Sequence, residues 1–167
     1  MIEIKRFYLQ IRSLEELNKV KKPSKSLKVE RSSNNFQLNK FFYREIGKKH
    51  RWVDRLSWSN ETWINYLSNK NLYTCVLKKN DDLVGYYEKI YYEENNEFEI
   101  AYFGIMAEYI GKGYGGFLLS EALENCLKEK VKRIWVHTCS LDHENAIKNY
   151  LARGMKLYKE EKIKISA

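Results

Sequence analysis

The chain has 167 residues, of which 44% are hydrophobic, so it carries enough apolar material to fold rather than stay disordered. No apolar run approaches the roughly 20 residues that cross a bilayer, and the N-terminus lacks the apolar core of a signal peptide. The scattered cysteines Cys75, Cys126 and Cys139 favour a reducing compartment over a disulfide framework. We expect one domain over residues 1–167, cytoplasmic and without a membrane partner.

The formal net charge of +8 is concentrated in two basic segments, residues 19–31 and 48–51. Such segments attract polyanions or phosphorylated ligands, or they simply form a solvated surface. The first segment lacks the interleaved aromatic residues that stack on bases, which argues against a nucleic-acid partner.

The N-terminal third of the chain predicts one strand followed by two helices. Alternating residues indicate a strand over 2–10. Apolar residues at helical spacing predict a helix over 34–46, which Gly47 ends. A second, short helix is expected to begin near Ser59, whose hydroxyl can cap it.

The middle of the chain is rich in residues that favour strands. Three strands are predicted over residues 72–79, 83–93 and 97–105. Asparagine and aspartate residues at 80–82 and 95–96 separate them and are good turn formers. We therefore expect an antiparallel meander.

The last third begins with a glycine-rich loop over residues 111–116 and a helix over 117–130 with a buried apolar stripe. A short strand over 131–138, a helix over 144–153 ended by a glycine, and a strand over 155–165 follow. The predicted order of elements is β-α-α-β-β-β-α-β-α-β.

The glycine-rich loop is the strongest local signal for a ligand. Gly111, Gly113, Gly115 and Gly116 let the backbone approach a ligand closely, and the helix that follows offers free N–H groups to a phosphate. The P-loop pattern, GxxxxGK followed by Ser or Thr, is absent. The dinucleotide pattern GxGxxG matches, but the next strand ends without the acidic residue that it requires, and the meander disagrees with a parallel sheet.

The loop resembles the pyrophosphate loop of GNAT acyltransferases. That pattern has Gln or Arg, two residues, a glycine, one residue and then Gly or Ala; Gly113 and Gly115 take the two small positions. Ile110 stands where the family has Gln or Arg, and Ala107 replaces a common proline. Because the family binds phosphate mainly through backbone amides, the resemblance implies weakened rather than lost cofactor binding.

The resemblance extends from residue 97 to residue 155. Residues 99–105 are similar to the family's fourth strand, and residues 142–155 to its last helix, NAxxxYxxxGF, with Glu144 where many relatives have proline. The stretch WVHTCSLDH is similar to a bacterial subgroup of generic acetyltransferases. The resemblance implies an α+β fold, the GNAT fold, with a mostly antiparallel six- to seven-stranded sheet flanked by about four helices.

The resemblance also implies transfer of an acetyl group from acetyl-CoA (coenzyme A) to a primary amine, on a small molecule or a peptide. Glu99 begins the strand beside the thioester, so it is the expected base, directly or through water; the alternative is a surface carboxylate. Tyr150 is the expected acid, because a phenol with a pKa near 10 is protonated at neutral pH; the alternative is a packed helix tyrosine.

Cofactor binding is expected, by the same resemblance, along the strand end, the loop and the last helix: Phe103, Gly104, Ile105, Met106, Ile110, Gly111, Lys112, Gly113, Tyr114, Gly115, Gly116 and Asn145. A bulge in the family's fourth strand frees backbone donors for the carbonyl.

The connection between the two N-terminal helices lines the acceptor pocket in relatives. Here Trp52, Asp54 and Trp58 could hold an amine through cation–π contacts and charge. They could equally be packing anchors with a salt bridge.

Two other chemistries are conceivable at the end of the predicted strand over 131–138 and just after it. His137, Cys139 and His143 match no common zinc spacing, so no metal is expected. Cys139 as a nucleophile needs His137 on its own face, which requires the strand to run that far.

Two rival functions also stay open, a GNAT-like module that binds acyl-CoA without turnover and a nucleic-acid-binding protein. A homodimer is compatible with the family.

Overall fold

The computed structural model describes residues 1–33 and 35–166; Asn34, the first residue of the predicted helix over 34–46, lies outside them. One mixed sheet has seven strands in the order β2-β3-β4-β5-β6-β1-β7. The elements in chain order are β1 (Ile2–Ile11), β2 (Leu27–Ser32), α1 (Phe36–Gly47), α2 (Asn60–Leu67), β3 (Leu72–Lys79), β4 (Asp82–Tyr92), β5 (Glu97–Ile105), α3 (Tyr114–Leu127), β6 (Arg133–Cys139), α4 (Asn145–Ala152) and β7 (Lys156–Ile165), with 3-10 helices at Leu14–Glu16 and Ala107–Tyr109. The predicted α+β fold class is confirmed.

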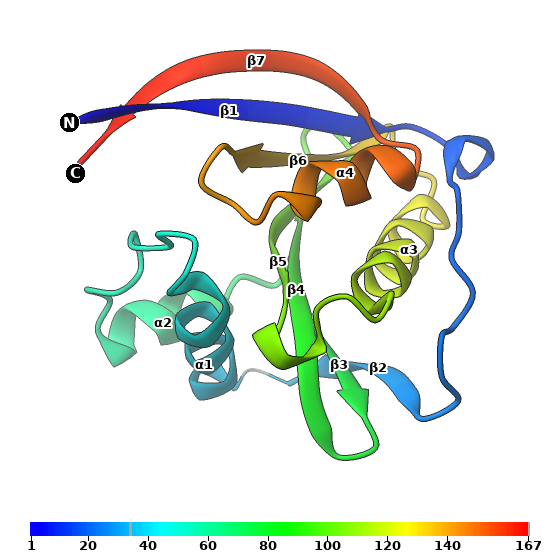
Figure 1. Cartoon of the computed structure of the whole chain (residues 1–167), viewed down its shortest axis with the longest axis horizontal. Coiled ribbons are helices and arrows are strands. Elements are labelled where there is room, and N and C mark those ends of the chain that lie inside the picture. Colours follow the sequence, from blue (N-terminus) through cyan, green and yellow to red (C-terminus); the bar gives the residue numbers. More distant parts are fainter. Residues whose placement is uncertain (34, 167) are drawn as a thin grey trace.

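The helices form two layers on the sheet. Figure 1 shows α1 and α2 on one side of the central strands, and α3 and α4 on the other. Strand β1 lies between β6 and β7, so the two ends of the chain run together as a ribbon along one edge. Within residues 1–33 and 35–166, no helix is both long and apolar enough to cross a bilayer.

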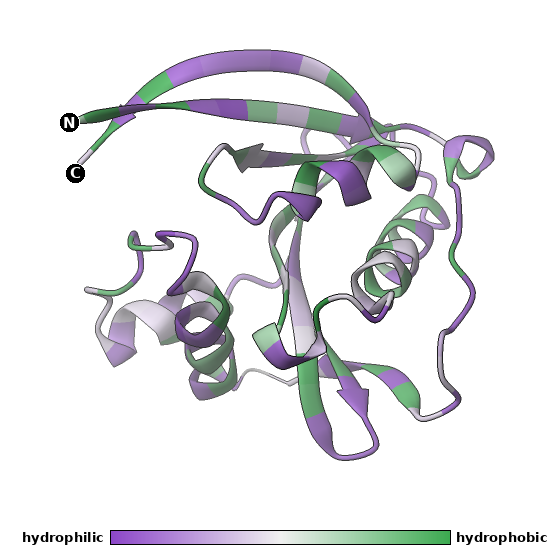
Figure 2. Ribbon diagram, viewed as in Figure 1, coloured by the Kyte–Doolittle hydropathy of each residue, from purple (hydrophilic) through white to green (hydrophobic). Residues whose placement is uncertain are grey.

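Helix α3 contributes more buried residues to the larger core than any other described element. Its residues Leu118, Leu119, Ala122 and Leu123 are fully buried against the sheet, as the predicted stripe requires, and each buried leucine contributes about 1.5–3 kcal/mol. Figure 2 shows the apolar colouring along α3, whereas the β1–β7 ribbon carries much polar colouring. A smaller cluster around Phe42 joins α1 to the opposite face of the sheet.

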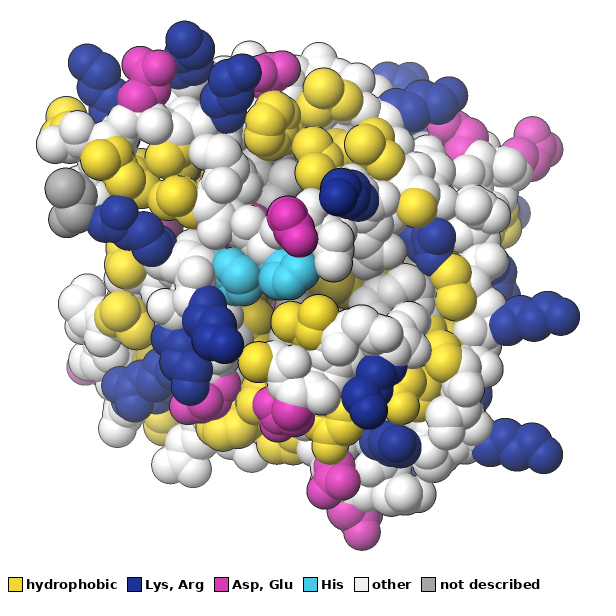
Figure 3. All heavy atoms as spheres, viewed as in Figure 1, with side chains coloured by type: hydrophobic (Ala, Val, Ile, Leu, Met, Phe, Trp, Pro, Cys, Tyr) yellow, Lys and Arg dark blue, Asp and Glu magenta, His cyan; other side chains and the backbone are white. Residues whose placement is uncertain are grey.

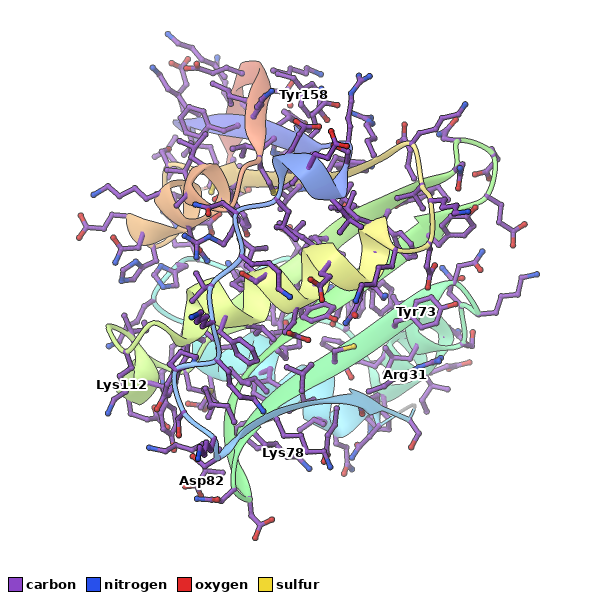
Figure 4. The ribbon with its side chains drawn as sticks, turned by 90° about the vertical axis from the view of Figure 1, so that its right-hand side faces the viewer. Arg31, Tyr73, Lys78, Asp82, Lys112 and Tyr158 are labelled. Carbon is purple, nitrogen blue, oxygen red and sulfur yellow. The ribbon has the colours of Figure 1, made fainter. Side chains whose placement is uncertain are left out.

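Strand β2 was not predicted and corrects the interpretation of the first basic segment. Its side chains alternate, with Leu27 buried and Val29 packed against the core. It pairs with β3 at the edge of the sheet, and the Arg31 guanidinium lies 4.4 Å from the centre of the Tyr73 ring (Figure 4). Charged residues are expected on an edge strand because they discourage pairing with other chains.

Helix α3 begins at Tyr114, three residues before the predicted start at residue 117. Gly113 is its N-cap, with φ of +81°. Gly115 and Gly116 therefore belong to the first helical turn and not to the loop. A Cβ atom at Gly116 would lie 2.7 Å from Nη1 of Arg153, so the glycine permits a close approach of α4 to this turn.

Among the described strands, β5 and β6 are the one parallel pair, and they separate after a short contact. Their register runs from Glu97 opposite Arg133 to Glu99 opposite Trp135, and ends there within the described residues. On its other edge β5 carries a bulge, because Ile100 and Tyr102 oppose consecutive residues of β4 and leave Ala101 unpaired. The sheet thus opens beyond Glu99.

A buried ion pair anchors the connection between α1 and α2 to the sheet. Arg55 is 7% exposed and Glu88 of β4 is 0% exposed, with 3.1 Å between Nη1 and Oε1. Tyr66 donates to Glu88 at 2.7 Å and Asn39 at 2.9 Å. The guanidinium also lies 4.1 Å from the ring centre of Tyr102. Both carboxylate oxygens of Glu88 therefore accept hydrogen bonds from protein donors.

The turn after α4 yields a test of backbone geometry. Gly154 has φ of +105°, and a Cβ there would lie 2.0 Å from the carbonyl oxygen of Glu16. Gly111 has φ of +86° with nothing within 4 Å. We expect Gly154→Ala to lower the free energy of unfolding by more than about 3 kcal/mol, and Gly111→Ala by about 1 kcal/mol. Urea denaturation measures both, and equal losses would contradict this packing.

The buried pair yields a second test. Glu88→Gln leaves the Arg55 charge buried without its counter-ion, so we expect a loss of about 3–5 kcal/mol in the free energy of unfolding. Glu93→Gln is the matched control, because its pair with Lys70 spans 3.8 Å with side chains 60% and 83% exposed, and such pairs contribute about 0–1 kcal/mol. A loss below 1 kcal/mol for Glu88→Gln would show that Arg55 is not held as described.

Candidate active site

Two cavities meet where β5 and β6 part. The loop cavity, of about 280 Å³, lies between the glycine-rich loop, the end of β5 and α4. The ribbon cavity, of about 520 Å³, lies on the α1–α2 face of the sheet and reaches the β1–β7 ribbon. The residues that line both cavities are His50, Trp52, Phe103, Asp142 and Tyr150.

The glycine-rich loop has the geometry of an anion site. Gly111 and Gly113 both have positive φ, and the first backbone bond of α3 runs from the Phe117 N–H to the Gly113 carbonyl. By helix geometry the N–H groups of Tyr114, Gly115 and Gly116 then have no intrahelical acceptor. The predicted loop residues that line the loop cavity are Ile110, Gly111, Gly113, Gly115 and Gly116.

Two predicted loop residues lie differently. Lys112 is exposed at the tip of the loop (Figure 4) and does not line either cavity. The side chain of Tyr114 is 6% exposed and packs in the core, so only its backbone faces the loop. The side chains of Lys112 and Tyr114 therefore do not face the loop cavity.

Helix α4 and its C-cap residue supply two polar side chains that the sequence does not single out. Asn149 donates from Nδ2 to the Gly115 carbonyl at 3.1 Å. Arg153 lies against Gly116, its Nε is buried without a partner among the described residues, and burial lowers its pKa. Asn149 follows the predicted Asn145 by four residues, so helical spacing could have revealed it. Both asparagines line the loop cavity.

The end of β5 lines the loop cavity through Phe103, Gly104 and Ile105. A Cβ at Gly104 would lie 2.6 Å from Cγ2 of Ile46, so α1 can approach only a glycine here. Met106, also expected to bind the cofactor, lines neither cavity: its N–H donates to the Val84 carbonyl at 2.8 Å and its side chain is buried. Its amide is therefore already engaged.

Tyr150 lies at the junction of the two cavities. Its ring meets that of Phe103 edge-on, with 6.3 Å between the centres. Burial, and secondarily the charge of Asp142, raise the pKa of the Tyr150 phenol. The hydroxyl is therefore protonated throughout the neutral range.

Glu99 lies in the ribbon cavity at the last β5–β6 pair. Its Oε1 accepts a hydrogen bond from the Tyr92 hydroxyl at 2.7 Å. Burial raises the pKa of Glu99, although Tyr92 and the charge of Arg55 act in the opposite direction. A half-buried carboxylate with increased proton affinity is a stronger base than a surface one.

The connection between α1 and α2 divides the predicted acceptor residues. Trp52 donates from Nε1 to Asp142 at 3.2 Å and lines both cavities. Asp54 is exposed and lines the ribbon cavity. Trp58 lines neither cavity, and the Arg55 guanidinium lies 4.7 Å from its ring centre. The cation in this aromatic cluster is the protein's own arginine, which sequence reasoning did not single out.

Strand β6 does extend far enough to place His137 and Cys139 on one face, and both line the ribbon cavity. Burial, and then the charge of Asp142, raise the pKa of the Cys139 thiol. An activated nucleophile requires the opposite shift. Among residues 1–33 and 35–166, no group of three His, Cys, Asp or Glu side chains could hold a metal ion.

Two histidines stand at the mouth of the site. The rings of His50 and His143 are 5.8 Å apart, and Figure 3 shows two histidine side chains side by side at the centre of this face. The Asn145 N–H donates to Nδ1 of His143 at 3.0 Å. The loop after α1 and the start of α4 therefore meet across the opening.

Comparison with known proteins agrees with this geometry. A sequence model described as the Acetyltransferase (GNAT) family matches residues 35–155. No curated protein is similar enough in sequence to count as a match.

Several solved structures share the fold. A GCN5-related N-acetyltransferase from Sphaerobacter thermophilus has a TM-score of 0.71 and 13% identity over 94% of this chain and 49% of its own. An aminoglycoside acetyltransferase from an uncultured soil metagenomic sample has a TM-score of 0.65 and 18% identity, over 79% of this chain and 90% of its own. The PaiA N-acetyltransferase from Thermoplasma acidophilum, in complex with coenzyme A, has a TM-score of 0.51 and 20% identity, over 64% of this chain and 75% of its own.

The chain spans 60% of the length of a functionally unknown Staphylococcus epidermidis protein that it resembles in fold, and about half that of the S. thermophilus structure. The family match includes α1, the glycine-rich loop and α4. Since the family model spans more than half of the chain, and the described residues form a seven-stranded sheet with four α-helices, this chain belongs to the GNAT acetyltransferase family.

Proposed function

We propose that the protein transfers an acetyl group from acetyl-CoA to a primary amine, with Glu99 as the base and Tyr150 as the acid. The observation that carries this proposal is the junction of the two cavities. A ligand that enters along the glycine-rich loop reaches Tyr150, and a second ligand in the ribbon cavity reaches the same residue past Glu99.

The residues of the loop cavity fit coenzyme A. The free N–H groups of Tyr114, Gly115 and Gly116 would hold its pyrophosphate at the positive end of α3. Asn145 and the end of β5 would flank the pantetheine arm. Ile110 offers no hydrogen bond, so the backbone N–H groups would have to hold the phosphates without a side chain at that position; the Arg153 guanidinium lies beside Gly116 but lines neither cavity.

Acetyl-CoA, when bound, supplies the acetyl group as an activated thioester. Glu99 takes a proton from the ammonium, directly or through a water, and the free amine forms the nitrogen–carbon bond. Backbone N–H groups of Phe103 and Ile105, which lie on the edge of β5 away from β4, would stabilise the oxyanion that develops on the carbonyl. The carbon–sulfur bond breaks, and Tyr150 gives its proton to the thiolate and recovers one from the new amide nitrogen.

The acceptor class we propose is a small-molecule amine, as for the structural neighbour named an aminoglycoside acetyltransferase. A peptide amine is the alternative acceptor. The proposed reaction belongs in the cytoplasm, where acyl-CoA is available and where Cys75, Cys126 and Cys139 would stay free.

Substitution of the two catalytic groups tests the mechanism. We expect Glu99→Gln to lower kcat by about 10²–10⁴-fold. Because Glu99 works as a base only when deprotonated and burial raises its pKa, the wild-type rate should fall as pH falls through that raised pKa. Glu99→Gln should lose this acid limb. Free-thiol release, measured over pH 5–9 with an amine screen, reports both effects.

Tyr150→Phe should lower kcat by about 10²-fold or more with little change in the Kd of acetyl-CoA. Glu93→Gln and Tyr158→Phe are matched controls, because both side chains are exposed and outside the two cavities. A module that only binds acyl-CoA would release no thiol in the wild type, and both catalytic variants would behave like their controls.

A further inference from the structure

A basic segment crosses the first turns of α3 beside the glycine-rich loop. This basic strap, residues 17–26, joins the 3-10 helix after β1 to β2, and it contains four lysines and no acidic residue. Figure 4 shows the connection that leads to β2 passing in front of α3, toward the end of that helix where Lys112 is labelled. The reaction proposed above assigns these lysines no role.

Hydrogen bonds to two helices hold the strap in this position. The Asn18 N–H donates at 2.9 Å to the carbonyl of Arg153, the C-cap residue of α4. The Val20 N–H donates at 2.9 Å to the hydroxyl of Ser120, which is fully buried in α3. The course of the strap over α3 is therefore fixed by backbone groups, whereas its lysine side chains are free to project outward.

The strap also contacts the glycine-rich loop on both sides of its lysine pair, residues 21–22. The Val20 side chain lies 3.3 Å from the point that a Cβ of Gly116 would occupy. The Pro23 ring lies 3.8 Å from the equivalent point at Gly113. Because consecutive Cα atoms are only about 3.8 Å apart, the lysine pair is attached immediately beside the proposed phosphate site.

The lysines of the strap differ in their partners. Lys19 pairs with Glu124 of α3 at 2.6 Å, so a carboxylate already balances its charge. Lys21, Lys22 and Lys25 are exposed. Within residues 1–33 and 35–166, none of these three lysines forms an ion pair. Three adjacent like charges repel one another, and a bound anion would relieve that repulsion.

The loop changes this balance little. Lys112 adds an exposed cation at its tip, and Glu108, exposed in the 3-10 helix before the loop, adds an anion. Neither forms an ion pair in the part of the chain that the structure describes. The strap therefore gives this side of the site an excess of positive charge.

Coenzyme A has an anionic group that the loop cavity would not enclose. The cavity volume of about 280 Å³ is below the roughly 300–1,000 Å³ of pockets that enclose drug-sized ligands, and coenzyme A is larger than such ligands. With the thioester at Tyr150 and the pyrophosphate at the start of α3, its nucleotide end would leave the cavity at the loop. That end carries the 3′-phosphate. The strap lies outside the cavity, beside the same glycines.

We propose that Lys21 and Lys22 bind the 3′-phosphate of coenzyme A, so that the protein distinguishes coenzyme A from its 3′-dephospho form. This inference rests on the proposed function of the site. A phosphomonoester carries about 1.5–2 negative charges at pH 7, and a lysine ammonium on its flexible stem binds phosphate as a point charge. Recognition of the nucleotide end is then separate from the backbone site for the pyrophosphate.

Paired ligands test the inference. CoA and 3′-dephospho-CoA differ only in this phosphate, and calorimetry gives the Kd of each for the full chain. We expect CoA to bind at least about fivefold more tightly, the effect of two exposed ion pairs. Because salt screens exposed charges, this preference should shrink as sodium chloride is raised from about 0.05 M to about 0.5 M.

The double variant Lys21→Gln with Lys22→Gln should weaken CoA binding and leave the Kd of 3′-dephospho-CoA unchanged, so that the preference disappears. A general loss of positive charge would instead weaken both ligands equally. Lys162→Gln with Lys164→Gln is the matched control, because it removes two charges from exposed residues of β7, of which Lys162 pairs with Glu3 at 3.5 Å. We expect this control to retain the full preference.

The outcomes separate the inference from the function on which it rests. Equal affinity of the wild type for the two ligands, or a preference that the double variant keeps, would overturn the role of the strap and leave the acetyl-CoA site intact. Loss of the preference in Lys112→Gln, with the double variant unaffected, would assign the phosphate to the loop and also overturn it. Binding of neither ligand would contradict the proposed function together with the inference.

Discussion

The separation of β5 from β6 is the constraint on which the rest of the structure depends. If the two parallel strands stayed paired along their whole length, their facing backbone N–H and C=O groups would bond to each other and leave no gap between the strands. Here the pairing ends at Glu99, and a bulge at Ala101 alters β5 on its other edge. The cleft that results is bounded by α4 and by the glycine-rich loop. The same irregularity therefore creates the space for a ligand and places Glu99 and Tyr150 beside it.

Buried charge holds the surroundings of this cleft in place. The pair of Arg55 and Glu88 fixes the connection between α1 and α2 on the sheet, and the bond from Trp52 to Asp142 ties that connection to the segment before α4. A buried ion pair adds little net stability but imposes one arrangement. A preorganised site requires this rigidity, because bound reactants must be held within tenths of an ångström.

The sequence predicted the parts of the fold that follow local rules. Apolar spacing located the helix that became α3, and Gly154 ended α4 as expected. Strand β2 was missed because only Leu27 and Val29 mark its inner face among basic residues that resemble a solvated loop. Arg55 and Arg153 were missed because their positions depend on partners from other elements. Motif spacing could place Glu99 and Tyr150 in a site, but only the fold shows that Trp58 is covered by Arg55.

The central claim, that the cleft between β5 and β6 is a site for acyl-CoA, is tested most directly by the thermal midpoint of the protein with acetyl-CoA, CoA, NAD and ATP at matched concentrations. A ligand at 100 times its Kd adds about 2.7 kcal/mol, which for a chain of this size raises the midpoint by roughly 5–10 °C. The account predicts such a rise with acetyl-CoA and CoA and little change with NAD or ATP. No rise with either CoA compound would contradict it.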